Sequence, residues 1–177
     1  MTAWVALLRG VNVGGITIRS VDLAGVFRDA LGFDAVRTFL ASGNVRFESA
    51  DRSSDRAGLK TRIESALRDR FGYEAWIVLL DQPTLARIVE DFPFEADREG
   101  WHPYVLLSSD PASLRDLLDS ADGLDTADEG LQMGDGVLYW HVERGRTLDS
   151  PFGKLTGKAK YKSTTTNRNL RTLRKLL

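Results

Sequence analysis

The first half of the chain alternates short apolar runs with stretches that place apolar residues every third or fourth position. Such spacing gives a helix one buried face, and it predicts a helix capped by Ser20 and a second one ending at Gly72. Strands are predicted at Ala3–Leu8, Val36–Leu40, Val45–Phe47 and Ala75–Leu80. The resulting order, β-α-β-β-α-β, is that of the split βαβ or ferredoxin-like unit.

The second half repeats this theme less regularly. A short helix opens at Pro83, and Asp110-Pro111 provides an N-cap and a first helical residue for another. A terminal helix is predicted to be capped by Thr166 or Asn167. Strands are predicted at Tyr104–Leu107, Leu131–Met133 and Val137–Val142. This half therefore reads β-α-β-β-α with a helix in front.

These patterns predict an α+β protein with two ferredoxin-like subdomains, each an antiparallel sheet with helices on one face. We expect the boundary near residues 80–82. Residues 1–80 would form the first subdomain, and residues 81–177 the second, which carries a basic C-terminal segment.

Composition excludes several classes of protein. The 177 residues are 42% hydrophobic, enough for a real core, and contain no cysteine, so disulfide scaffolds, thiol catalysis and thiolate metal sites are excluded. The first apolar run ends at Arg9, far short of the roughly 20 residues that span a bilayer, and no basic stretch precedes it. We therefore expect a cytoplasmic protein without a membrane partner. The sequence carries no signal of oligomeric state.

Charge is distributed unevenly along the chain. The net charge is −1, but the 28 residues from Ser150 to Leu177 hold eight basic and no acidic side chains. The preceding 149 residues therefore carry −9. Such asymmetry is typical of a tail that binds a partner, or of a tail folded against its own acidic body.

The opening segment Trp4–Gly15 resembles the signature of a bacterial family of unknown function, the domain of unknown function numbered 1697. Four further segments carry the same resemblance, and Leu170 stands where that pattern usually has tryptophan. They are Gly32-Phe33, Val36–Phe39, Ser42–Val45 and Thr166–Asn169, the last followed by Thr172 and Leu173. The resemblance implies two ferredoxin-like subdomains and a bacterial origin, and it implies no established activity.

Two loops of the first half are candidates for ligand binding. The glycines of Arg9–Gly15 would allow backbone N–H groups to form an anion-binding nest, and Arg9 would add a fork of donors. The loop lacks the spacing of a P-loop or a dinucleotide site, and a tight connection is the alternative. Ser42-Gly43-Asn44 is first a hairpin tip, and it would be functional if it faced the Arg9 loop.

The basic C-terminal segment is the strongest physical signal. A helix start with cations beside it is a natural phosphate site, and Tyr161 would be available to stack on a base. The alternative is a tail docked on the acidic body. The histidines His102 and His141 show no metal-ligand spacing, so we predict neither a metal nor a cofactor. Acidic clusters such as Asp122–Glu129 are predicted to be solvated surface.

The leading hypothesis is a binding module for a phosphate-bearing ligand, either nucleic acid or a nucleotide. The alternatives are an enzyme that acts on a small anionic substrate between the two halves, and a structural protein without a ligand. The candidate ligand-binding residues come from both loops and from the basic segment. They are Arg9, Asn12, Gly14, Gly15, Ser42, Asn44, Lys158, Lys160, Arg168 and Asn169.

Overall fold

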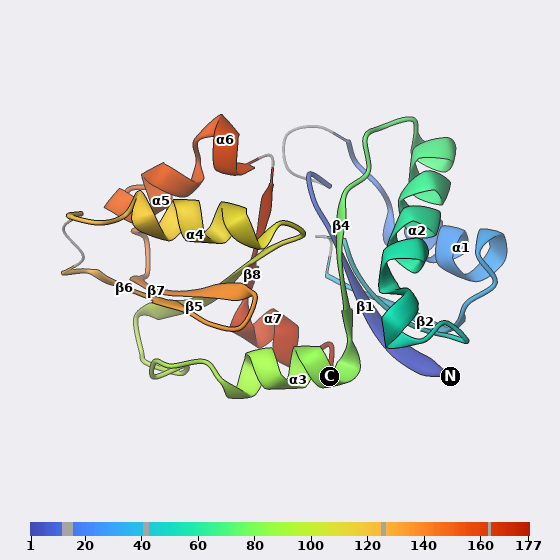
Figure 1. The fold of residues 1–177 in the computed structure, drawn as a ribbon, viewed down its shortest axis with the longest axis horizontal. Coiled ribbons are helices and arrows are strands. Elements are labelled where there is room, and N and C mark those ends of the chain that lie inside the picture. The colour runs from blue at the N-terminus through green and yellow to red at the C-terminus, as the bar shows by residue number, and fades with distance from the viewer. Residues whose placement is uncertain (12–15, 41–42, 125–126, 163) are drawn as a thin grey trace. The chain divides into compact units, whose positions relative to one another are not determined.

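A computed structural model describes the whole chain except residues 12–15, 41–42, 125–126 and 163 (Figure 1). The chain divides into two compact units. Unit one comprises Met1–Leu85 with Leu176–Leu177, and unit two comprises Ala86–Lys175. Each unit has its own four-stranded antiparallel sheet with helices, which confirms the α+β class and the two ferredoxin-like subdomains.

Unit one follows the predicted order of elements. Its sheet has the strand order β2-β3-β1-β4, the arrangement of a ferredoxin-like unit. The strands are β1 (Thr2–Leu8), β2 (Asp34–Phe39), β3 (Asn44–Ser49) and β4 (Ile77–Asp81). The helices are α1 (Ser20–Gly25), its π-helical continuation η1 (Val26–Ala30), the 3-10 turn η2 (Ser53–Asp55) and α2 (Arg56–Phe71).

The core of unit one lies between one face of this sheet and its helices. Alternate residues of β1, Trp4 among them, pack with the buried face of α2, which includes Leu59 and Ile63. Gly72 ends α2, as predicted, and it adopts the left-handed conformation. The predicted cap of the first helix is wrong by one residue, because Arg19 is the N-cap and Ser20 is already helical.

Unit two has the same sheet order, β6-β7-β5-β8. Its strands are β5 (Trp101–Ser108), β6 (Glu129–Met133), β7 (Val137–Glu143) and β8 (Thr165–Asn169). The helices of this half are α3 (Gln82–Glu90), which begins in unit one, α4 (Pro111–Asp119), α5 (Pro151–Thr156), α6 (Ala159–Lys162) and α7 (Leu170–Arg174). The prediction lacked β8, α5 and α6.

Helices α4, α5 and α6 lie on one face of the unit-two sheet (Figure 1) and form its core with residues such as Trp140 and Phe152. Asp110 caps α4 as predicted, since its carboxylate accepts the Ala112 N–H at 3.0 Å. The predicted cap of the terminal helix is wrong. Thr166 and Asn167 lie within β8, and Asn169 caps α7 instead. Within the described residues, no helix is long and apolar enough to cross a membrane.

Candidate functional site

The predicted ligand-binding residues divide between the two units. Arg9 and Asn44 lie in unit one, whereas Lys158, Lys160, Arg168 and Asn169 lie in unit two. The predictions for Asn12, Gly14, Gly15 and Ser42 fall outside the described residues.

In unit one, the end of β1 meets the turn between β2 and β3. The Leu8 N–H donates to the Gly43 carbonyl at 2.8 Å. Gly43 has a φ of +69°, and a Cβ added there would lie 2.8 Å from the Leu8 Cβ. Only glycine fits both the backbone conformation and this close approach. The hairpin tip thus lies against the start of the predicted anion-binding loop.

Arg9 and Asn44 have different roles at this end of the sheet. The Asn44 side chain is fully buried, and its Nδ2 donates to the Phe39 carbonyl at 2.9 Å, which closes the turn. Asn44 is therefore a structural residue of the hairpin. Arg9 is half-buried, its backbone N–H donates to the Trp76 carbonyl at 3.0 Å, and burial lowers the pKa of its guanidinium.

Trp76, beside Arg9, lies in the apolar segment Ala75–Leu80 that was predicted to form a strand. Its surface is 46% exposed, whereas its neighbours Ala75 and Ile77 are buried. The Lys60 ammonium lies 5.6 Å from the centre of the indole and pairs with the Glu64 carboxylate, which also accepts the Ile77 N–H at 3.0 Å. Trp76 and Lys60 thus join Arg9 at one end of the sheet.

At the opposite end of β1, unit one has an open pocket of about 520 Å³. The arginine that lines it, Arg62, is already paired. The Arg62 guanidinium donates to the Asp51 carboxylate at 2.9 Å and lies 5.3 Å from the centre of the Phe33 ring. Because this arginine already has a partner, the pocket is a weaker candidate for phosphate binding than the basic segment of unit two.

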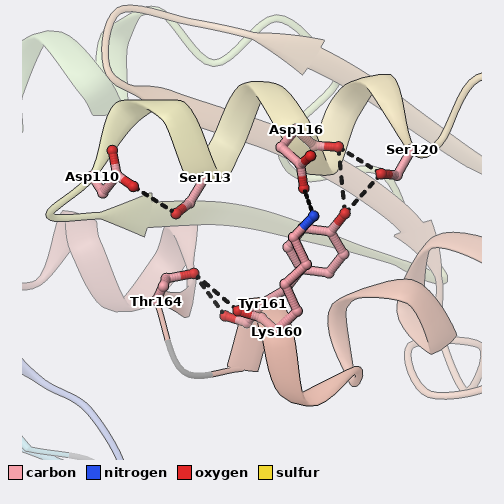
Figure 2. Close-up of polar contacts among 7 residues, drawn as sticks. All are labelled: Asp110, Ser113, Asp116, Ser120, Lys160, Tyr161 and Thr164. Carbon is pink, nitrogen blue, oxygen red and sulfur yellow. Dashed lines mark hydrogen bonds and ion pairs between the residues drawn. The ribbon is translucent and has the colours of Figure 1, made fainter.

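In unit two, part of the basic segment packs against α4 of the same unit. Figure 2 shows Lys160 paired with Asp116 of α4 at 2.6 Å, and the Tyr161 and Ser120 hydroxyls sharing a hydrogen bond of 2.7 Å. Tyr161 is only 3% exposed. The expectation that Tyr161 would stack on a base is therefore wrong, because its ring is part of the core.

Arg168 and Asn169 also contribute to the structure of unit two. Arg168 on β8 pairs with Val105 and is buried, which lowers the pKa of its guanidinium to about 10. Its Nη1 donates to the Thr166 hydroxyl at 2.7 Å. The Asn169 side-chain oxygen Oδ1 accepts the Arg171 N–H at 2.9 Å as the cap of α7. Neither side chain projects freely into solvent.

Three lysines in and around α5 and α6 differ from Lys160. Lys154, Lys158 and Lys162 are exposed, and among the residues that the structure describes none of the three forms an ion pair. They lie on α5, on the residue before α6, and on the last residue of α6. The segment thus combines cations that hold the fold with cations that face solvent.

A second cluster in unit two surrounds His141, which is 4% exposed. Its ring stacks on Phe94 with centroids 5.6 Å apart and lies 4.8 Å from the Trp101 ring. The Nε2 atom has no hydrogen-bond partner in the described residues. Burial, and then the charge of Arg98, lower the pKa of His141, while Glu95 opposes them. In the described ranges, no group of three or more His, Asp or Glu side chains is placed to hold a metal ion.

We expect His141 to make unit two less stable in mild acid. Its pKa is lower in the folded state than in the unfolded state, where it is about 6.5. The stability of unit two is therefore fully present above about pH 6.5. It falls as the pH drops below that value, because the unfolded chain takes up the proton more readily than the folded one. The urea midpoint, measured between pH 8 and pH 5, should fall less in His141→Phe than in the wild type. Equal falls would contradict this expectation.

Comparisons with known proteins agree with the fold. The family described as "Protein of unknown function (DUF1697)" matches residues 1–139. Among curated proteins, none matches the chain. One similar solved structure is that of a conserved bacterial protein from Streptococcus pneumoniae. It has a TM-score of 0.81 and 23% sequence identity, with 99% of this chain and 96% of that chain covered. At this identity, the likeness shows the fold alone.

Proposed function

The chain belongs to DUF1697, a family of proteins of unknown function, and we propose that it binds nucleic acid. The binding surface that we propose is the basic segment of unit two. The observation that carries this proposal is a group of three exposed lysines in and around α5 and α6, Lys154, Lys158 and Lys162, for which the described part of the chain provides no ion-pair partner. A nucleic-acid partner also fits the cytoplasmic location that we propose for a bacterial protein of this kind.

The physical argument is local. The whole chain has a net charge of −1 and a pI of about 6.1, so its overall field does not attract a polyanion. Lysines held by internal ion pairs, such as Lys160, would have to give up a partner before they met a phosphate. The three exposed lysines have no such cost, and each phosphate that they neutralise would release condensed counterions.

The first test is fluorescence anisotropy with labelled single-stranded and duplex oligonucleotides at about 50 and 200 mM salt. We expect binding that weakens steeply with salt. Replacing Lys154, Lys158 and Lys162 together by alanine should lower the slope of log K against log salt by about 2 to 3, since each phosphate that is no longer neutralised reduces it by roughly one.

A matched control removes three exposed cations from unit one. Replacing Arg52, Arg56 and Arg70 by alanine changes the net charge by the same amount but leaves the basic segment intact. This variant should keep the wild-type salt slope. The proposal fails if no oligonucleotide binds at about 50 mM salt, or if both triple variants weaken binding equally.

A further inference from the structure

We propose that Trp76 is a stacking platform for the bases of single-stranded nucleic acid, with Arg9 beside it to meet a phosphate. This inference rests on the proposed function and deepens it, because it selects the single strand as the partner. The residues concerned all belong to unit one.

The first observation is the exposure of Trp76. Two other tryptophans that the sequence places on strands, Trp4 and Trp140, are 0% and 1% exposed and are explained by core packing. Trp76 is 46% exposed although it directly precedes the buried Ile77 of β4. A large apolar ring left in water forgoes burial energy, and it has the flat surface on which bases of any sequence stack.

The second observation is the charge around the ring. The N–H···O bond from Arg9 to Trp76 continues the β1–β4 ladder, in which Leu8 pairs with Ile77. Arg9 and Trp76 are therefore cross-strand neighbours, whose Cβ atoms lie about 5 Å apart in such a ladder. The Lys60 ammonium lies 5.6 Å from the ring centre. Lys60 is paired with Glu64, so Arg9 on the neighbouring strand is the cation next to Trp76 that suits a phosphate, while the aromatic face suits the base.

The hairpin tip adds a second exposed apolar side chain at the same end of the sheet. Leu40 is 56% exposed and has a φ of +56°, a conformation that non-glycine residues rarely adopt. It follows β2, in the turn whose Gly43 carbonyl accepts the Leu8 N–H. Exposed Leu40 and Trp76 thus lie on either side of the end of β1, within the span of neighbouring strands.

The chemistry favours a single strand over a duplex. In a duplex, the faces of the bases are covered by neighbouring pairs, and side chains reach only base edges and phosphates. A single strand exposes base faces, and stacking on an aromatic side chain is tolerant of sequence. One arginine is too few for a duplex groove, but it suits the phosphate of one stacked nucleotide in a single strand.

The experiment measures the affinity of the full chain for a labelled single strand and for a duplex of equal length. Trp76→Leu should weaken single-strand binding by about 10-fold or more and leave the salt slope unchanged, because stacking neutralises no phosphate. Trp76→Phe should restore most of the affinity, because it keeps an aromatic face. Duplex binding should be the same in all three proteins. Tryptophan quenching by the single strand should be lost in Trp76→Phe.

Two results would overturn the inference. One is wild-type single-strand affinity in Trp76→Leu, and the other is equal loss on single strand and duplex. Since Trp76 is exposed, both variants should keep the wild-type melting temperature. If no oligonucleotide binds at all, the proposed function itself fails. If binding depends on Lys154, Lys158 and Lys162 but not on Trp76, only this inference fails.

Discussion

Replacing Gly153 by alanine is expected to destabilise unit two by at least about 3 kcal/mol. Gly153 lies in the first turn of α5, where a Cβ would stand 2.0 Å from the Thr147 carbonyl oxygen and 3.0 Å from the Ser150 hydroxyl. Both contacts are with the turn that caps α5, and the Ser150 hydroxyl accepts the Gly153 N–H. The added methyl group would therefore break this cap and push the turn away from the buried Phe152.

The matched control is Gly58→Ala in α2. A Cβ at Gly58 meets nothing within 4 Å, and the residue lies in a helix. Alanine should therefore stabilise unit one by about 0.5–1 kcal/mol through higher helix propensity. Urea unfolding followed by tryptophan fluorescence measures both changes. A Gly153→Ala protein as stable as the wild type would show that the turn at Thr147 relaxes without cost.

Unit one was predictable because each of its elements carries its own signal. The helix ending at Gly72 has an apolar face at helical spacing and a glycine that takes the left-handed conformation. The strand Ala3–Leu8 is apolar throughout, which fits a central strand with buried residues on both faces. In these segments, local propensity and tertiary packing favour the same structure.

Strand β8 was missed because its sequence carries no such signal. Thr165–Asn169 reads Thr-Thr-Asn-Arg-Asn, with no apolar side chain to mark a buried face. It forms a strand because β5 offers it an unpaired edge, and Thr166 and Arg168 become buried there beside Leu107 and Val105. Partners distant in sequence decide this element, and periodicity does not detect them.

The candidate site, too, was predicted from the sequence only in part. The glycine at position 43 indicated a turn, and the structure gives the reason in its contact with Leu8. Trp76 lies in a predicted apolar strand and is nevertheless 46% exposed, because exposure depends on what the fold places over a residue. Lys160 and Arg168 were expected to meet a ligand, but Asp116 and burial in β8 account for them. Charge counts predict a basic segment, and only the fold tells which cations remain exposed.

Glu129 is the second position where a large effect is expected, and it lies in a cluster that the sequence assigned to solvated surface. Its side chain is 5% exposed. One carboxylate oxygen accepts the Trp140 Nε1–H and the other accepts the Phe152 N–H, both at 2.9 Å. The carboxylate therefore holds β7 to the first turn of α5, where a backbone N–H has no partner within the helix.

Glu129→Ala should destabilise unit two by about 4 kcal/mol, because two buried donors lose their acceptor at roughly 1–3 kcal/mol each. Glu129→Gln keeps one acceptor and turns an NH₂ group toward the other donor, so it should cost about half as much. Asp128→Ala is the matched control. Asp128 is exposed, and its ion pair with Arg146 at 3.5 Å is a surface pair worth at most about 1 kcal/mol.

Urea midpoints rank the three Glu129 and Asp128 variants, and near-ultraviolet circular dichroism reports whether Trp140 keeps its environment. We expect the order Asp128→Ala, Glu129→Gln, Glu129→Ala from most to least stable, with the Trp140 signal weakened only in the last two. If Glu129→Ala were as stable as Asp128→Ala, water would have to satisfy both donors. The carboxylate would then not be what joins β7 to α5.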